Sequence, residues 1–219
     1  MYPENAPDDL AKQDQTDNSR LRQFYEIAKE LNNEDIMVVE LIDYMHEMKE
    51  AEAGHYLYFL TDTHWNTFGS YFGYYKAMTM IYEDCGIAGT KPYELDEMEV
   101  YNDYRTGGDL VNFLQFDGNE VNETTTYCTY AGTHKAKIEN IADGSVCTTI
   151  DDEKLPTLVV MRDSFGSAIL EHLSEHFSTM WYTPYNCGLA RCYDYLKTQK
   201  PDYFLQVLVE RSINSLLSE

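Results

Sequence analysis

Residues 158–166 read Leu-Val-Val-Met-Arg-Asp-Ser-Phe-Gly, an apolar run that ends in a short polar turn. Four consecutive apolar residues are typical of a strand buried on both faces of a parallel sheet. In open α/β sheets, sites form where the strands end, and the N–H groups that begin the next helix can donate to a developing oxyanion. Ser164 therefore has the position of a nucleophile on a strand-to-helix turn, although Asp-Ser is also a common helix N-cap.

Strands and helices are predicted to alternate on both sides of this run. Between residues 90 and 150, a Tyr- and Thr-rich loop region is expected to hold a β-hairpin, Thr124–Tyr130 with Lys135–Ile141. The alternation predicts βαβ units, so we expect one α/β domain over residues 1–219, with a mostly parallel sheet covered on both faces and an irregular arm at residues 1–19. Helices are expected at about 20–31, after residue 39 to about 53, 66–84, 167–176 and 189–198, and strands at 36–39, 56–60, 158–161, 179–182 and 203–209.

The composition excludes several classes of partner. Acidic residues outnumber basic ones by 38 to 16, which gives a formal net charge of −22. Binding to nucleic acid or to an anionic membrane surface needs a cluster of Lys and Arg, and the sequence has none. No apolar run approaches the roughly 20 residues of a membrane span, and no signal peptide precedes the first helix. Five cysteines without a CxxC spacing favour neither a disulfide framework nor a zinc ribbon, although Cys128 and Cys147 could pair across a hairpin.

Asp62 and His64 are candidates for the partners that a nucleophilic serine needs. They lie two residues apart at the end of a predicted strand. Side chains at i and i+2 of an extended segment point to the same side, so the carboxylate can hold the imidazole in one tautomer. The alternative is a surface histidine beside a helix-capping aspartate, which the pair alone does not exclude.

Two blocks of sequence together resemble a known family. Residues 58–69, Tyr-Phe-Leu-Thr-Asp-Thr-His-Trp-Asn-Thr-Phe-Gly, resemble the TDxHWxxxG signature of alginate O-acetyltransferase-like proteins, which include the DHHW proteins. Arg162-Asp163-Ser164-Phe165-Gly166 resembles the serine block of this family, and Pro184-Tyr185-Asn186 and Val209-Glu210-Arg211 resemble its later segments, so that the resemblance covers about residues 20–211. It implies a three-layer, SGNH-hydrolase-like α/β domain. In it Asp62 orients His64, His64 acts as general base and then acid, and Ser164 carries the acyl group.

The resemblance also implies a substrate class and a location. We expect a polysaccharide acceptor and an acetyl donor (a membrane acyl-transfer protein is one candidate), no cofactor, no nucleic-acid partner, and a location outside the cytoplasm. With water as the acceptor, the same groups would make an esterase. Gly108, in the loop at 106–110, and Asn186 are candidates for the oxyanion site, and Tyr185 is a candidate for the wall of the cleft. Family members have a further strand and a Pro-x-Lys loop before the segment that resembles residues 2–7, so the first strand of the family is expected to be missing here.

Two other functions fit parts of the sequence. His172-Leu-Ser-Glu175-His176 matches the HxxEH pattern of inverzincin peptidases, in which two histidines one helical turn apart bind zinc and the glutamate acts as base; Glu210 would be a candidate third ligand. An ordinary polar helix face near its C-terminus is the alternative explanation of this pattern. The second function is that of a protein with the same fold that binds carbohydrate without turning it over, against which the presence of all three triad residues argues.

Overall fold

A five-stranded sheet carries the serine block. The computed structural model describes residues 20–30, 35–117, 120–185 and 189–212, so the arm expected at residues 1–19 lies outside the described residues. The strand order is β3-β4-β6-β5-β7, with Ser164 two residues beyond the end of the fourth strand in this order. The strands are β3 (Lys137–Asn140), β4 (Val146–Thr149), β5 (Thr157–Arg162), β6 (Thr179–Pro184) and β7 (Tyr203–Val207).

The sheet is mixed rather than mostly parallel. β5 lies between β6 and β7 and is parallel to both, whereas β4 is antiparallel to β6 and to β3. β3 and β4 are joined by the short turn Ala142–Gly144, and a tight turn can connect only antiparallel neighbours. β5, β6 and β7 are joined by helices, which is the connection that parallel strands require. The predicted parallel arrangement therefore holds for the part of the sheet that carries Ser164 and is wrong for the hairpin at its edge.

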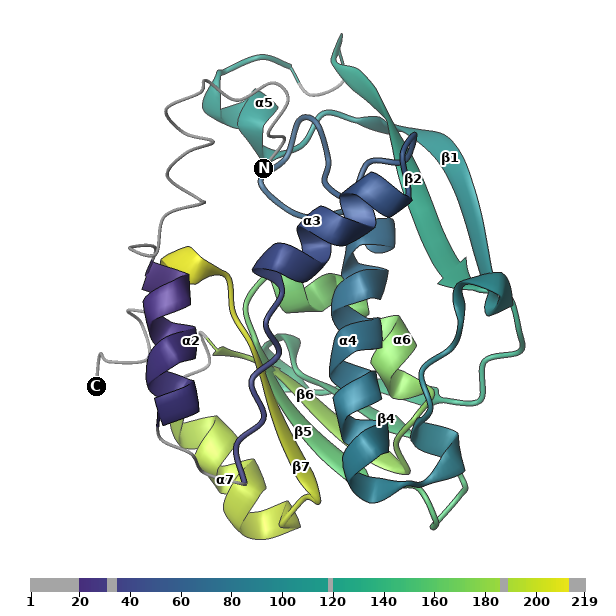
Figure 1. The fold of residues 1–219 in the computed structure, drawn as a ribbon, viewed down its shortest axis with the longest axis vertical. Helices are drawn as coiled ribbons and strands as arrows, with labels where there is room; N and C mark the ends of the chain where they lie inside the picture. Colours follow the sequence, from purple (N-terminus) through teal and green to yellow (C-terminus); the bar gives the residue numbers. More distant parts are fainter. Residues whose placement is uncertain (1–19, 31–34, 118–119, 186–188, 213–219) are drawn as a thin grey trace.

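Helices cover both faces of this sheet (Figure 1). Leu158 and Val160 of β5 point into the larger apolar core, to which α4 and α6 contribute, whereas Val159 and Met161 pack on the other face with Cys192 of α7. Alternate residues of one strand are thus buried on opposite faces, as the unbroken apolar run of β5 predicts. The helices are α2 (Arg20–Glu30), α3 (Ile42–Ala51), α4 (Thr67–Cys85), α5 (Asp109–Phe113), α6 (Leu170–Ser174) and α7 (Leu189–Gln199), with short 3₁₀ segments at Ala88–Thr90, Leu95–Glu97, Ala142–Gly144 and Phe165–Ile169.

The first turn of α4 fixes the chain just after the Asp62–His64 block. Asn66 is the N-cap of α4: its Oδ1 accepts the N–H of Gly69 at 2.8 Å, and its Nδ2 donates to the carbonyl of Tyr56 at 2.6 Å. A Cβ at position 69 would overlap the carbonyl of Leu57, so glycine is what allows the helix to approach the preceding segment. The cap therefore ties the loop that carries His64 to a helix whose inner side is buried in the core.

A separate two-stranded ribbon lies beside α4, at the right of Figure 1. It consists of β1 (Met98–Thr106) and β2 (Asn122–Tyr130), which pair antiparallel over nine residues each. The hairpin predicted between Thr124–Tyr130 and Lys135–Ile141 is therefore wrong: β2 pairs with β1, and Lys137–Asn140 pairs with β4. The N–H groups of Lys135 and Ala136 donate to the carboxylate of Glu175 instead of a strand partner, at 2.9 and 3.4 Å.

Three other local expectations differ from the structure. Residues 36–39 form no strand, and Ile36 is 51% exposed, because an apolar run alone does not supply a pairing partner. Residues 56–60 form only the single bridge between Tyr58 and Trp65, since side chains of Asn66 and Glu123 bind the backbone groups at both ends of this segment. The helix expected at 167–176 is a 3₁₀ segment followed by the short α6.

The described residues contain neither the disulfide considered above nor a helix suited to cross a membrane. Cys128 in β2 and Cys147 in β4 lie in different sheets and are free thiols, so the pairing considered for them does not occur. Of the helices in the described ranges, none combines the length and the apolar character that crossing a bilayer would take.

Candidate active site

Ser164, His64 and Asp62 form a continuous chain of hydrogen bonds. The Oγ of Ser164 lies 2.6 Å from Nε2 of His64, and Nδ1 of His64 lies 2.6 Å from Oδ1 of Asp62. With the proton on Nδ1, His64 donates to the carboxylate, and its Nε2 lone pair accepts from the Ser164 hydroxyl. Ser164 is exposed, whereas the side chain of Asp62 is only 13% exposed. The fold thus brings together two blocks that are 100 residues apart in the chain.

The chain folds back on itself between Tyr58 and Trp65 and presents His64 from this loop. Tyr58 and Trp65 form an antiparallel bridge, and the N–H of Phe59 donates to the carbonyl of His64 at 3.2 Å. The backbone N–H of His64 also donates to Oδ1 of Asp62, at 3.2 Å. One carboxylate oxygen therefore receives both the backbone and the ring of His64, which fixes the direction of the imidazole.

A buried glutamate of the ribbon holds the start of this loop. Glu123 in β2 accepts the N–H of Leu60, the N–H of Thr61 at 3.2 Å and the hydroxyl of Thr61 at 2.7 Å. Hydrogen bonds to a charged acceptor are stronger than those between neutral groups. Because these bonds end one residue before Asp62, they fix the point from which the side chain of Asp62 projects.

Trp65 joins the histidine block to the serine block. Its indole Nε1–H donates to the carbonyl of Phe165 at 2.9 Å, and this bond is buried. The ring of Phe165 lies 4.9 Å from the ring of His64 and 5.5 Å from that of Trp65, measured between centroids. The residue after Ser164 thus packs directly on His64 and Trp65.

Asp163, rather than Ser164, caps the serine turn. The carboxylate of Asp163 accepts the N–H of Phe165 at 2.9 Å and the N–H of Val209 at 2.8 Å, while its own N–H donates to the carbonyl of Val207 at 3.1 Å. The side chain of Ser164 makes no capping bond. The Asp-Ser pair therefore does cap the segment, but through Asp163: Ser164 occupies the N-cap position, and its hydroxyl contacts His64 instead of a backbone N–H.

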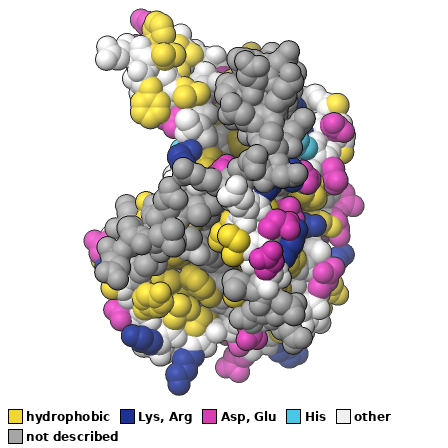
Figure 2. Space-filling view, turned by 60° about the vertical axis from the view of Figure 1, so that its left-hand side comes forward, with side chains coloured by type: hydrophobic (Ala, Val, Ile, Leu, Met, Phe, Trp, Pro, Cys, Tyr) yellow, Lys and Arg dark blue, Asp and Glu magenta, His cyan; other side chains and the backbone are white. Residues whose placement is uncertain are grey.

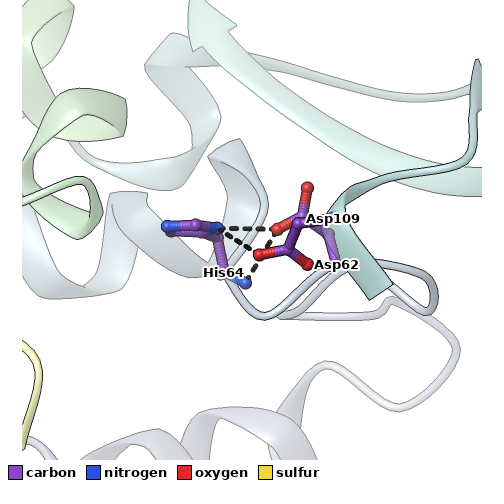
Figure 3. Close-up of side chains that lie close together, drawn as sticks. All are labelled: Asp62, His64 and Asp109. Atoms are coloured by element: carbon purple, nitrogen blue, oxygen red, sulfur yellow. Dashed lines mark hydrogen bonds and ion pairs between the residues drawn. The ribbon is translucent and has the colours of Figure 1, made fainter. Parts of the chain in front are cut away.

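Several groups surround the carboxylate of Asp62. Nη2 of Arg105 donates to Oδ2 of Asp62 at 3.2 Å, and Oδ2 of Asp109 lies 3.8 Å from Nδ1 of His64. Figure 3 shows the carboxylates of Asp62 and Asp109 both facing the His64 ring. Burial acts to raise the pKa of Asp62, but the hydrogen bonds from His64 and Arg105 together outweigh it and hold this pKa below its ordinary value. Asp62 is therefore ionised at neutral pH.

The sequence reasoning missed Arg105 and Glu123 as part of this site. They face each other in the register of the ribbon, and Nε of Arg105 lies 3.7 Å from Oε1 of Glu123. The available signal was a single glutamate inside a threonine-rich strand, a residue type that is rarely buried without a partner. That signal could not name the partner, because β1 was predicted to be a loop.

The three predicted candidates for the rest of the cleft fall in different places. The N–H of Gly108 donates to Oγ1 of Thr61 at 2.9 Å, so this donor already has a partner, and the glycine lies against the side chain of Asp62. Tyr185 directly follows β6 and packs with the smaller apolar cluster on the α7 face. Asn186 lies outside the described residues.

The HxxEH stretch does not form a zinc site. Nδ1 of His176 donates to the carbonyl of Gly89 at 2.8 Å and its Nε2 lies 2.6 Å from the hydroxyl of Tyr74, so both ring nitrogens already have partners. Glu175 accepts Nδ1 of His134 at 3.1 Å and the two N–H groups of the adjoining loop. Burial lowers the pKa of His172 and of His176 to about 4, which fits neutral rings in an aromatic core. This alternative is therefore wrong on structural grounds.

Within the described ranges, Asp62, His64 and Asp109 are the one group of possible ligands that converge closely enough to hold a metal ion. Their ligand atoms lie within 4.8 Å of one another. A cation there would compete with the Nδ1 proton of His64, which already bridges to Asp62. The arrangement is thus suited to orienting an imidazole for proton transfer.

The rim of the site at α5 is apolar. Figure 2 shows apolar side chains gathered at the top of the molecule, a second apolar patch at the lower left, and acidic side chains mainly on the right-hand side. Asp109, the first residue of α5, accepts the N–H of Thr63 at 2.8 Å, so the apolar rim begins next to the loop that carries His64. The exposed apolar residues there are Leu110, Phe113, Leu114 and Phe116, between 38 and 73% exposed.

Known proteins share this sequence pattern and fold. The model of the family described as "SGNH hydrolase-like domain, acetyltransferase AlgX" matches residues 1–179, which include all three residues of the hydrogen-bonded chain. No curated protein sequence matches the chain. Several solved structures have a similar fold at low sequence identity.

PatB1 of Bacillus cereus is 17% identical to the chain, with a TM-score of 0.61; the match covers 82% of the chain and 71% of PatB1. A DHHW family protein from Eubacterium siraeum is 16% identical, with a TM-score of 0.55 and a match over 74% of the chain and 62% of that protein. The O-acetyltransferase domain of Pseudomonas putida AlgJ is 17% identical, with a TM-score of 0.51 and a match over 89% and 67%. The chain thus spans 62 to 71% of the length of these solved structures.

Proposed function

Because the chain belongs to the family of SGNH hydrolase-like domains described as acetyltransferase AlgX, we propose that it transfers an acyl group, in the first instance acetyl, through Ser164. The acceptor or source of the group is a hydroxyl of a cell-surface or secreted polysaccharide. In this proposal His64 is the general base and acid, and Asp62 orients it. The observation that carries the proposal is the unbroken hydrogen-bonded chain from Asp62 through His64 to an exposed Ser164.

The first half of the reaction forms an acetyl-enzyme. Nε2 of His64 takes the hydroxyl proton as Oγ of Ser164 attacks the carbonyl carbon of the donor. The resulting imidazolium is stabilised by Asp62, whose ionised state fits this role. The tetrahedral intermediate collapses when the leaving alcohol of the donor takes the proton from His64, and the acetyl group stays on Oγ.

The second half repeats these steps with an acceptor hydroxyl. His64 takes the proton of the sugar hydroxyl, the sugar oxygen attacks the acetyl carbon, and Ser164 regains its proton as the ester bond to Oγ breaks. Water in place of the sugar gives hydrolysis by the same steps. The N–H of Ser164 is the proposed oxyanion donor, since the N–H of Phe165 is already bound by Asp163. Asn186 remains the candidate for a second donor.

The overall charge supports an uncharged or cationic acceptor. With a net charge of −22, the chain repels polyanions, and the guanidinium of Arg105, which contacts the triad directly, is already paired with Asp62. We propose an extracytoplasmic location for the reaction, since polysaccharides of this kind lie outside the cell, and a separate acetyl donor that reaches Ser164 from solvent.

Mass spectrometry of the intact protein tests the proposal directly. The chain is mixed with p-nitrophenyl acetate, an activated acetyl ester, and quenched within seconds. One added acetyl group that maps to Ser164 is expected, together with release of p-nitrophenolate, and Ser164→Ala and His64→Ala should abolish both. Ser167→Ala is the matched control, because Ser167 is an exposed serine of the same 3₁₀ segment and its side chain makes no bond to His64.

The outcome also separates the proposed enzyme from a carbohydrate-binding protein with the same fold. An acetyl group on Ser164 that disappears when a neutral oligosaccharide is added, with matching acetylation of the sugar, indicates a transferase. Loss to water alone indicates an esterase. No acetylation of Ser164, in a folded protein that still binds the sugar, contradicts the proposal and favours the binding function.

A further inference from the structure

The ribbon contributes an ion pair that reaches Asp62 from the side opposite to His64. Arg105 and Glu123 face each other across β1 and β2, with Nε of Arg105 3.7 Å from Oε1 of Glu123. Nη2 of the same guanidinium donates to Oδ2 of Asp62 at 3.2 Å, while Oδ1 of Asp62 binds His64. The two oxygens of the catalytic carboxylate thus serve two different partners, one in the ribbon and one in the loop.

We propose that Arg105 is a positioning residue for the reaction: held by Glu123, it fixes the carboxylate of Asp62 in the orientation that aligns His64 with Ser164. The inference rests on the proposed function and goes beyond it, because it makes the inserted ribbon a working part of the active site. Arg105 touches neither Ser164 nor the position of the acyl carbon, so its effect passes through Asp62.

Packing holds the guanidinium of Arg105 next to the carboxylate of Asp62. Its central carbon lies 3.8 Å from the centroid of the Phe59 ring, which stacks on it, and the side chain of Arg105 is 23% exposed. Its Nη1 is buried, and no acceptor among the described residues binds it. Asp62 and Glu123 are therefore the acidic partners that the described residues offer Arg105.

The charge arrangement supports the same role. Glu123 is buried, with 2% of its side chain exposed, and it also holds Leu60 and Thr61 at the base of the catalytic loop. Without Arg105, the carboxylates of Asp62 and Glu123 would share a half-buried region without a nearby cation. Such a pair raises the pKa of at least one carboxyl, whereas the hydrogen bond from Arg105 lowers the pKa of Asp62.

Three substitutions of Arg105 test the proposal by hydrolysis of p-nitrophenyl acetate. For Arg105→Met we expect kcat to fall by about 10- to 100-fold with KM little changed, as for other residues that orient a reacting group through a partner. The acid limb of the pH–rate profile should move to higher pH, because the pKa of Asp62 rises when its cation is removed. Arg105→Lys should move the limb back and restore part of kcat, since the ammonium supplies the charge without the two-pronged geometry.

A purely structural role predicts a different pattern. It would lower the melting temperature and the yield of folded protein, would leave the pH–rate profile of the folded fraction unchanged, and would not be relieved selectively by lysine. Arg22→Met is the matched control: the side chain of Arg22 is 24% exposed and pairs with Asp43 at 2.7 Å, between α2 and α3. It should not move the acid limb. Should Arg105→Met fail to fold, Arg105→Gln is a second neutral variant: it is shorter than arginine by two atoms, keeps an amide donor on the side of Glu123 and removes the charge next to Asp62.

Failure of this inference can be told apart from failure of the proposed function. If Ser164→Ala is still acetylated and hydrolyses the ester like the parent chain, the proposed function is wrong. If Ser164→Ala is inactive while Arg105→Gln and Arg105→Met keep the parent kcat and acid limb, the triad stands and the role of Arg105 is overturned.

Discussion

Replacing Gly108 by alanine tests how closely the loop at 106–110 constrains Asp62, the proposed orienting residue. Gly108 lies against Asp62, and a Cβ at this position would be 2.5 Å from Cβ and 2.8 Å from Cγ of Asp62. Its φ of −89° and ψ of −155° are values that alanine adopts without strain. The substitution also keeps the N–H of residue 108, which donates to Thr61. The added methyl group therefore acts first through contact with Asp62, which supplies the three atoms nearest to it.

The size of the effect follows from the distances. Ordinary van der Waals contact for a Cβ begins near 3.4 Å, so Asp62 or the loop at 106–110 must move by about 1 Å to make room. A misplacement of about 1 Å in a catalytic group costs on the order of 100-fold in rate, or about 2.7 kcal/mol of transition-state stabilisation. Overpacking of a well-filled region costs about 1–3 kcal/mol in the free energy of unfolding.

Ester hydrolysis and urea unfolding measure these two quantities. We expect Gly108→Ala to lose about 100-fold in kcat/KM. Gly54→Ala is the control: Gly54 has a φ of +110° and nothing within 4 Å of an added Cβ, so it should lose stability through backbone strain and keep its activity. Full activity of Gly108→Ala, at unchanged stability, would refute the view that this glycine leaves room for the triad. It would instead fit a role for the N–H of Gly108 alone.

Two further predictions concern the joints around the site. Trp65→Phe removes the donor to the buried carbonyl of Phe165 and should lower the free energy of unfolding by about 1–3 kcal/mol in urea; a change within experimental error would mean that this bond is replaced by another. His172 and His176 have pKa values lowered by burial to about 4 from an ordinary value of 6.5, so the unfolded chain binds more protons and stability should decline as the pH falls from 6.5 through 4. His172→Leu should flatten this decline in a series of unfolding curves at different pH, and an equally steep decline would speak against a neutral, buried His172.

The parts of the fold that could be predicted from sequence are those fixed by local pattern. Four apolar residues in a row predict β5, and the cap at Asn66 with the apolar repeat that follows predicts α4. The residues of the candidate site were predictable for a similar reason, since Asp62 and His64 lie two residues apart and Ser164 follows a buried strand. The contact between these two blocks needed the resemblance to a family, because no local rule links residues 100 positions apart.

The parts that could not be predicted depend on competition for backbone groups. The segment at 56–60 has the composition of a strand and residues 135–136 begin a predicted one, but Asn66, Glu123 and Glu175 bind their backbone groups through side chains. The sequence also does not indicate which strand pairs with β2. β2 has the residues of a strand, but its pairing with β1 is seen only in the structure. The Arg105–Asp62 contact inherits this difficulty, since it exists only once that pairing is known.

The bond between Trp65 and Phe165 has a consequence for how the molecule would lose its activity. In the proposed reaction the proton passes between two parts of the structure: its acceptor, His64, belongs to a loop held by the ribbon, and its donor, Ser164, follows a strand of the main sheet. If the two parts moved apart by the width of one water molecule, the hydrogen bond between Ser164 and His64 would break and activity would be lost, while every helix and strand stayed intact. On warming or in mild denaturant, activity should accordingly be lost before the protein unfolds. The difference between the two midpoints measures how strongly the two parts are held together.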